Sequence, residues 1–158
     1  MRLITPDEAR EIHANRAPVG LNFAPGYPTP GAREVMDLYV GERTGAIPPG
    51  FTPFFMVRKS DGVVIGEIGY TTAEEQMVAT AGYGVTPSCE GQGFTTEAMT
   101  GLIQHCFALG FGTVRADTTA DHIASRRVME KSGMTFLEQI EREEDGALAT
   151  IVVYAIDA

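Results

Sequence analysis

The segment Glu90-Gly91-Gln92-Gly93-Phe94-Thr95 constrains the fold of this chain more than any other, because it joins a strand pattern directly to a long helical one. The strand pattern covers 78–85, and the helical pattern ends at Gly110. Two glycines let the backbone turn its N–H groups outward, and the helix adds free N–H groups and the positive end of its dipole. The segment is therefore either a pyrophosphate site or simply a tight strand-to-helix connection. It is neither a Walker loop nor a dinucleotide GxGxxG motif.

Start and turn signals elsewhere predict a chain that mixes helices and strands. A first helix begins at Thr5-Pro6, where Glu8 completes a capping box, and Thr29-Pro30 repeats the arrangement for a second helix. The order expected is two helices, three strands, a helix, a strand, a helix and two strands. The remaining predicted ranges are loops at 24–28 and 46–50, strands at 54–58, 63–70, 78–85, 114–119, 135–143 and 149–156, and a helix at 123–132.

Composition narrows the class of protein. A length of 158 residues, with 44% hydrophobic and 21% charged, suits one folded domain and excludes a disordered chain. A net charge of −9 argues against duplex DNA or an anionic membrane as partner, because the field repels phosphate. No stretch approaches the roughly 18 apolar residues of a membrane span, and the amino terminus turns polar too soon for a signal peptide.

The cysteines and histidines show no spacing typical of a disulfide, redox or metal site. The two cysteines, Cys89 and Cys106, form no CxxC motif, which favours a reduced, cytoplasmic setting. Nothing in the sequence beside Cys89 supplies a base that would activate its thiol. The three histidines show no metal-ligand spacing, so we expect no metal.

Two segments together resemble a known family. The first runs Gly82-Tyr83-Gly84-Val85-Thr86-Pro87 and then Gly91-Gln92-Gly93-Phe94-Thr95-Thr96-Glu97-Ala98-Met99, and it resembles the coenzyme A loop of the GCN5-related N-acetyltransferases (GNAT). The second, Asp121-His122-Ile123-Ala124-Ser125-Arg126-Arg127-Val128-Met129-Glu130-Lys131-Ser132-Gly133-Met134, resembles a helix of the branch that includes the ribosomal-protein amino-terminal acetyltransferases. The resemblance covers residues 54–156, with both motifs in the right order.

This resemblance implies one GNAT-like α+β domain over residues 1–158. The implied fold has a central, mostly antiparallel sheet of about six or seven strands, flanked by about four helices. A bulge in the strand at 78–85 would open the sheet into a V-shaped slot for acetyl-CoA, the implied acyl donor. The implied cofactor-binding residues are Tyr83, Gly84, Val85, Gly91, Gln92, Gly93, Phe94, Thr95, Thr96, His122 and Arg126.

Several residues depart from the family pattern. Glu90 stands where the loop usually begins with Arg or Gln, and a carboxylate about 6 Å from a phosphate costs about 3 kcal/mol at an effective dielectric constant of about 20. Screening removes most of this cost if Glu90 points to solvent. Thr95 replaces the second Gly or Ala. His122 replaces an Asn, and either donates a hydrogen bond in its place or lies exposed with no role. Arg126 and Arg127 either offset coenzyme charge, for example at its 3′-phosphate, or are two solvated helix arginines.

The usual catalytic side chains of the family are both replaced. Met129 stands where many relatives have a tyrosine acid, and Thr80 where the branch often has a glutamate base. Glu67 is a replacement base if it faces the slot rather than water. Tyr83 either bonds a substrate or packs beside the bulge, and Ser125 matches the family serine in a catalytic or a structural role. Glu67, Tyr83 and Ser125 are therefore the candidate catalytic residues.

Our main functional hypothesis is acetyl transfer from acetyl-CoA to a primary amine by direct attack in a ternary complex. The acceptor would be a protein N-terminus, an amino acid or a small amine. Deprotonation at pH 7 costs about 1 kcal/mol for an α-amine but about 4.6 kcal/mol for lysine, so the missing base favours a weakly basic amine. The alternative is a catalytically degenerate GNAT-fold module that binds coenzyme A weakly or acts as a binding or regulatory protein.

The last predicted hairpin carries a run of acids. The run is either a solvated tip or the border of a site for a cationic acceptor. The sequence leaves open whether the chain forms a homodimer, as is common in the family, and whether a longer acyl-CoA is used. The acids of the run are Glu138, Glu141, Glu143, Glu144 and Asp145.

Overall fold

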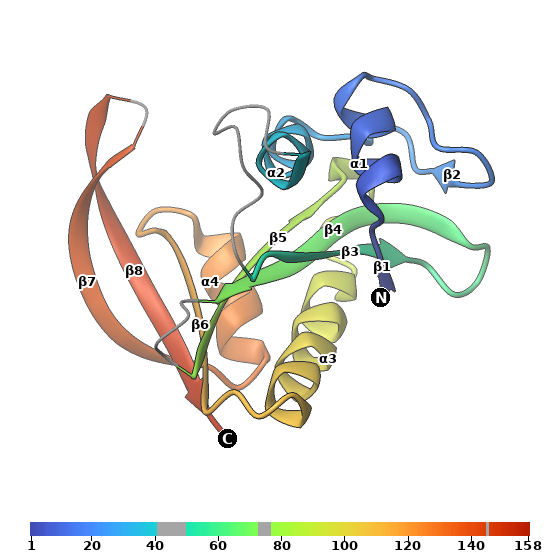
Figure 1. Ribbon diagram of the computed structural model, residues 1–158. Helices are drawn as coiled ribbons and strands as arrows, with labels where there is room; N and C mark the ends of the chain where they lie inside the picture. The colour runs from blue at the N-terminus through green and yellow to red at the C-terminus, as the bar shows by residue number, and fades with distance from the viewer. Residues whose placement is uncertain (41–49, 73–76, 145) are drawn as a thin grey trace.

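The computed structural model describes residues 1–40, 50–72, 77–144 and 146–158 (Figure 1). These residues form an eight-stranded sheet with the order β1-β3-β4-β5-β6-β8-β7, and β2 pairs with β4 off this path. The elements are β1 Arg2–Leu3, α1 Pro6–His13, β2 Asn22–Phe23, α2 Pro30–Val40, β3 Thr52–Val57, β4 Val63–Thr72, β5 Val78–Val85, the 3-10 helix η1 Pro87–Cys89, α3 Phe94–Ala108, β6 Thr113–Thr119, α4 Ile123–Lys131, β7 Thr135–Glu144 and β8 Ala147–Asp157.

The first two helices begin where the sequence predicts. The Thr5 hydroxyl accepts the Glu8 N–H at 3.3 Å, and the Glu8 carboxylate accepts the Thr5 N–H at 3.0 Å, which completes the capping box. At α2 the Thr29 hydroxyl accepts the Ala32 N–H at 3.1 Å. These side chains satisfy amide groups that have no partner within the first helical turn.

Helices cover both faces of the sheet, and each face has its own apolar core. Figure 1 shows α1 and α2 on one side and α3 and α4 on the other. The first core packs α1 and α2 against β3 and β4 around Phe55, which is fully buried. The second and larger core packs α3 and α4 against the rest of the sheet through residues such as Leu102 and Met129. The sheet is therefore held as a middle layer with two chemically separate faces.

The sheet opens between β5 and β6, as the resemblance implies. The two strands pair in parallel only from Val78 to Ala81, opposite residues 113–116. Beyond Ala81, β5 pairs with β4 alone as far as Val85, while β6 pairs with β8 as far as Thr119. The two strands thus separate toward their carboxyl ends, and the mixed α+β fold with a V-shaped opening is confirmed.

Two details differ from the sequence predictions, and a third prediction is left untested. The strands β1 and β2 have two residues each, too few to show any periodicity in the sequence. The register shift lies between β3 and β4 at Met56/Val57, one strand away from the bulge expected in β5. Most of the predicted loop at 46–50 lies outside the described residues. Among the described residues, no helix has both the length and the apolar character to cross a membrane.

Close contact between β4 and β5 generates a stability prediction. A Cβ at Gly66 would lie 2.2 Å from the Gly84 carbonyl oxygen and 2.9 Å from the Val85 Cα, so Gly66→Ala forces two backbones apart. We expect a loss of about 1–3 kcal/mol in the free energy of unfolding, measured by urea denaturation. Gly82→Ala is the control, because a Cβ there meets nothing within 4 Å, and its change should stay within about 0.5 kcal/mol. Equal losses in the two variants would contradict the packing described here.

Candidate active site

The glycine loop before α3 presents backbone donors to solvent. Gly91 and Gly93 have φ of 70° and 85°, a left-handed conformation that side chains rarely adopt. Among the described residues, no backbone carbonyl accepts the N–H groups of 91–96, and no side chain caps α3. The Gln92 side chain instead turns back and donates to the Ser88 carbonyl at 3.0 Å. The loop and the first turn of α3 therefore form a nest of free N–H groups suited to an anion.

The Glu90 side chain, which precedes this nest in the chain, is exposed to solvent. Glu90 ends η1, where its N–H donates to the Pro87 carbonyl at 3.3 Å. Because water and salt screen an exposed carboxylate, the cost of placing a phosphate nearby is reduced.

Beyond Ala81, the edge of β5 that faces β6 has no strand partner among the described residues. Tyr83 and Val85 pack with the core that contains α3 and α4, and the alternation of the strand places Gly84 on the opposite face. The predicted cofactor residues Tyr83, Gly84 and Val85 therefore lie along one arm of the opening. An extended chain could add to this edge as a strand does.

Tyr83 and Ser125 lie together across the opening. The Tyr83 hydroxyl donates to the Ser125 carbonyl at 3.0 Å and lies 2.8 Å from the Ser125 hydroxyl. Burial raises the pKa of Tyr83, although the bond to Ser125 opposes this, so the phenol keeps its proton at neutral pH. Two candidates from distant parts of the chain, one on β5 and one on α4, thus form one hydroxyl pair.

Glu67 lies on the other face of the sheet, buried against β5. It pairs with Gly84 in the β4–β5 ladder, and its Oε1 lies 2.3 Å from the place where a Cβ of Gly84 would be. Only 3% of Glu67 is exposed, and this burial raises its pKa from 4.5 to about 8, against opposing contacts with Tyr27 and its own backbone. Oε2 makes no hydrogen bond of good geometry to any described residue. A buried carboxyl with an unpaired oxygen is unusual unless it serves a function.

Tyr27 is the residue that the sequence did not single out. Its hydroxyl is buried beside the Glu67 carboxyl, and like Oε2 it makes no well-formed hydrogen bond within the described chain. The ring stacks on Phe23 with centroids 5.1 Å apart and meets Phe55 edge-on at 6.4 Å. Burial, together with the Glu67 charge, raises the pKa of Tyr27. The only signal in the sequence is an aromatic residue in a loop of Pro and Gly.

The residues of α4 predicted to hold the cofactor make contacts within the protein. His122 is exposed, and its Nδ1 lies 3.1 Å from the Thr118 hydroxyl. The Arg126 guanidinium donates to the Ala120 carbonyl at 3.0 Å and to the Tyr154 hydroxyl at 3.4 Å. Arg126 thus braces the turn between β6 and α4, and a role toward the cofactor stays a prediction for both residues.

The other residues chosen from the family pattern fall into two groups. Phe94, Thr95 and Thr96 form the first turn of α3 and are half-buried beside the nest. Met129 is fully buried in the core, and Thr80 is exposed before the opening. The positions of the usual acid and base therefore hold no titratable group.

Cys89 has a basic neighbour that the sequence did not reveal. The Arg58 guanidinium, at the end of the β3–β4 hairpin, donates toward the buried Cys89 sulfur at 3.9 Å. The same guanidinium binds Asp61 through Nε and Nη2 at 2.6–3.1 Å. Arg58 therefore links the hairpin to η1, just ahead of the glycine loop.

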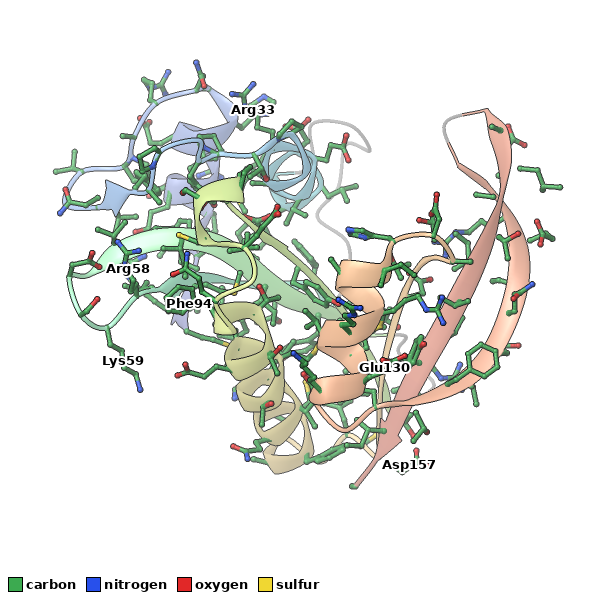
Figure 2. All side chains as sticks on the ribbon, turned by 180° about the vertical axis from the view of Figure 1, so that it is seen from behind. Arg33, Arg58, Lys59, Phe94, Glu130 and Asp157 are labelled. Carbon is green, nitrogen blue, oxygen red and sulfur yellow. The ribbon has the colours of Figure 1, made fainter. Side chains whose placement is uncertain are left out.

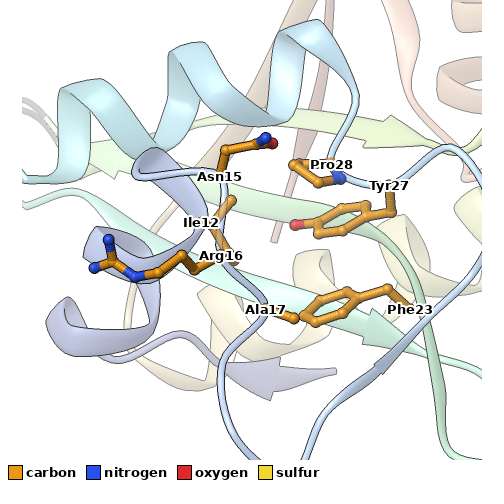
Figure 3. Close-up of a pocket in the computed structure, with 7 residues that line it drawn as sticks. All are labelled: Ile12, Asn15, Arg16, Ala17, Phe23, Tyr27 and Pro28. Atoms are coloured by element: carbon orange, nitrogen blue, oxygen red, sulfur yellow. The ribbon is translucent and has the colours of Figure 1, made fainter.

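A hollow of about 190 Å³ lies behind Tyr27 (Figure 3). It is lined on one side by the stacked rings of Phe23 and Tyr27 and on the other by the chain after α1. Its one charged residue, Arg16, is paired with Glu11 at 2.7 Å. The hollow meets the site at Tyr27, beside Glu67, but its lining includes no residue of the glycine loop or of the V-shaped opening. The described residues contain no group of three or more side chains arranged to hold a metal ion.

Comparison with known proteins agrees with this geometry. The family model described as "Acetyltransferase (GNAT) domain" matches residues 1–135, most of the chain. The chain belongs to the GNAT acetyltransferase family. No curated protein matches it significantly.

Solved GNAT structures share the fold across nearly the whole chain. A chimera of spermidine N-acetyltransferase SpeG from Vibrio cholerae and hSSAT has a TM-score of 0.70 at 15% identity, covering 99% of this chain and 94% of that one. A ribosomal-protein-S5-alanine acetyltransferase from Vibrio fischeri has a TM-score of 0.67 at 19% identity, covering 99% and 91%. A GNAT-family acetyltransferase from Bacillus anthracis has a TM-score of 0.64 at 19% identity, covering 79% and 74%. At these identities the likeness establishes the fold but not the acceptor substrate.

The buried carboxyl of this GNAT protein predicts a pH-dependent stability. Because the pKa of Glu67 is raised to about 8 in the folded state, that state binds more protons than the unfolded chain at intermediate pH, and stability falls as pH rises from about 5 to 8. Glu67→Gln removes this dependence. We expect the variant to gain several kcal/mol relative to wild type between pH 5 and pH 9, at most about 5.

Urea unfolding at the two pH values checks this. Glu34→Gln is the control, because Glu34 is exposed on α2, and its difference in stability from wild type should be the same at both pH values. A Glu67→Gln difference that does not change with pH would show that the carboxyl is not held neutral by burial.

Proposed function

We propose that this GNAT protein transfers an acetyl group from acetyl-CoA to a primary amine. The observation that carries the proposal is the V-shaped opening with the buried Glu67 carboxyl on one face of the sheet and the Tyr83–Ser125 hydroxyl pair on the other. Acyl transfer to an amine needs a proton acceptor on the amine side and a proton donor on the thiol side. The two faces supply one of each.

The residues present fit the coenzyme. The nest at 91–96 would hold the pyrophosphate through backbone N–H groups, and the free edge of β5 from Tyr83 to Val85 would pair with the amides of the pantetheine arm. When bound, acetyl-CoA supplies the acyl group as a reactive thioester. Exposure of Glu90 leaves this arrangement workable despite the like charge.

Glu67 would accept the proton of the attacking amine. Its unpaired Oε2 is the available atom, acting directly or through one water. A pKa of about 8 is close to the pKa of about 7.8 of an α-amine and well below the pKa of about 10.4 of a lysine side chain. This match supports a weakly basic amine, such as a protein N-terminus or an amino acid, as the acceptor.

Tyr83 and Ser125 would deliver the proton that the departing thiolate needs. Tyr83 remains a phenol at neutral pH because burial raises its pKa, so it can donate rather than accept. Ser125 is 8% exposed, and its hydroxyl is placed to replace that proton along the 2.8 Å contact. In this assignment the pair substitutes for the tyrosine acid of relatives, whose position holds Met129.

Acids on the last hairpin support a cationic acceptor. Glu138, Glu141 and Glu143 are exposed on β7, and Asp145 of the same predicted run lies outside the described residues. The Glu141 carboxylate accepts the Thr150 hydroxyl at 2.9 Å, and Arg142 pairs with Asp117 at 2.7 Å. The surplus of acids gives β7 a negative field that would attract an ammonium group. Two of the similar structures are named for spermidine and for a ribosomal protein, both amine-bearing molecules.

A second candidate is a GNAT-fold module that binds coenzyme A weakly and catalyses nothing. The burial of Met129 at the position of the usual tyrosine acid, and the negative charge of Glu90 beside the nest, favour it. Calorimetric titration with acetyl-CoA and with free coenzyme A separates the two candidates. We expect micromolar binding of both ligands, whereas no binding at high micromolar concentration would reject the enzyme in favour of the module.

Amine acetylation across pH tests the role of Glu67. A base must be ionised to act, so we expect kcat/KM of the wild type to rise with pH through an apparent pKa near 8. Glu67→Gln should lower kcat/KM by about 10²–10⁴-fold and remove that component of the profile.

Thiol release from acetyl-CoA, followed with acceptors of different amine pKa, provides the readout. The component near pH 8 should not move with the acceptor if it belongs to Glu67. Glu34→Gln should leave the profile unchanged. Wild-type rates in Glu67→Gln would assign the base elsewhere.

The hydroxyl pair gives a separate prediction. Tyr83→Phe and Ser125→Ala should each lower kcat by about 10²-fold, because the thiolate loses its proton donor, while coenzyme affinity stays within about threefold. Thr135→Ala is the control, since this exposed hydroxyl donates to the Ala155 carbonyl at 3.4 Å where β7 pairs with β8. A loss of coenzyme binding with kcat retained would make the pair a binding element instead.

A further inference from the structure

The proposed coenzyme carries more negative charge than the nest accounts for. Its phosphates would approach a protein of net charge −9, with Glu90 beside the loop and Glu97 in the first turn of α3. Arg126, the cation expected from the sequence to help, is bonded to the Ala120 carbonyl and the Tyr154 hydroxyl. The other cation of that segment, Arg127, is exposed on α4. A second source of positive charge lies across α3, on the β3–β4 hairpin.

A groove of about 380 Å³ lies between the β3–β4 hairpin and the first turns of α3. Its floor is apolar, formed by Met56, Ile65, Phe94 and Ala98, and its outer rim carries Arg58 and Lys59. Figure 2 shows Arg58, Lys59 and Phe94 on the same side of α3, with α4 on the opposite side. The groove meets the phosphate nest at Phe94, because that residue is both the first of α3 and part of the lining.

The two rim cations differ in whether they already form ion pairs within the protein. Arg58 is bound to Asp61 and reaches toward the Cys89 sulfur, so it is held in place and largely neutralised. Lys59 is exposed and forms no ion pair with any described residue. Lys59 is thus the cation of the rim that is free to bind an incoming phosphate.

We propose that this groove binds the adenosine 3′-phosphate end of coenzyme A, with the base on the apolar floor and the 3′-phosphate at Lys59. The proposal rests on the proposed function, because it assigns one end of the same ligand. An apolar floor beside a cationic rim is complementary to a nucleoside 3′-phosphate, which has a planar base and a phosphate on its ribose. Glu97 also lines the groove and repels phosphate, which directs the phosphate to the hairpin side. The hairpin thereby supplies the charge that the Glu90 loop lacks.

Calorimetry on the full chain tests this with coenzyme A and 3′-dephospho-coenzyme A, which differ only in that phosphate. We expect Lys59→Gln to weaken binding of coenzyme A about five- to tenfold and to leave binding of the dephospho form unchanged. Arg127→Gln tests the competing cation, because Arg127 is exposed on α4, on the other side of α3. It should change neither affinity by more than about twofold.

The possible results separate this proposal from the proposed function. If wild type binds neither ligand, the proposed function fails and the groove assignment fails with it. If wild type binds both ligands and Lys59→Gln binds them as wild type does, only the groove assignment is overturned. A selective loss in Arg127→Gln would instead place the 3′-phosphate on the α4 side.

A second variant tests the floor of the groove. Ala98→Phe fills the space for the base, so it should weaken coenzyme A, the dephospho form and adenosine 3′,5′-bisphosphate alike, by about tenfold or more. A thermal melt shows whether the variant is folded. A folded Ala98→Phe that binds all three ligands as wild type does would place the base outside the groove.

Discussion

The separation of β5 from β6 after Ala81 is the constraint on which the rest of the candidate site depends. While the two strands pair, each satisfies the other's backbone groups; once they part, the edge of β5 is left to bind something else. The same separation lets α4 approach β5, which brings Ser125 within 2.8 Å of Tyr83. Continued pairing with β4 keeps Gly84 against Glu67 on the opposite face. One local loss of pairing therefore creates the slot and positions groups on both sides of it.

The two sides of the slot differ in how their polar groups are satisfied. Tyr83 and Ser125 bond each other, so their burial costs little. The Glu67 carboxyl and the Tyr27 hydroxyl are also buried, yet each has an oxygen without a well-formed hydrogen bond to the described chain. Buried polar atoms without partners lower the stability of the folded state, and such atoms are found most often at functional sites. The polar groups on one face are therefore hydrogen-bonded to each other, whereas those on the other face keep unpaired oxygens.

Local signals predicted the parts of the structure that depend on neighbours in sequence. The capping box at Thr5 and Glu8 and the left-handed glycines at 91 and 93 form from residues a few positions apart, so a single sequence shows them. The two short strands were not predicted, because they are strands only through their pairing with β3 and β4 and show no pattern of their own. The Tyr27 contact with Glu67 and the Arg58 contact with Cys89 were not predicted for a similar reason, since each joins segments far apart in the chain.

By itself the sequence determined the order of the longer elements, the glycine loop and the resemblance to a family with this fold, because each depends on short-range patterns of residue type. It named Glu67, Tyr83 and Ser125 as candidates but did not determine which way any of them faces. Tertiary structure decided that Glu67 is buried against Gly84 with a raised pKa, and that Tyr83 and Ser125 meet. It also decided that Arg126 is bonded within the protein while Lys59 is not. Burial and contact depend on strand register and on packing between distant segments, and no short-range pattern records those.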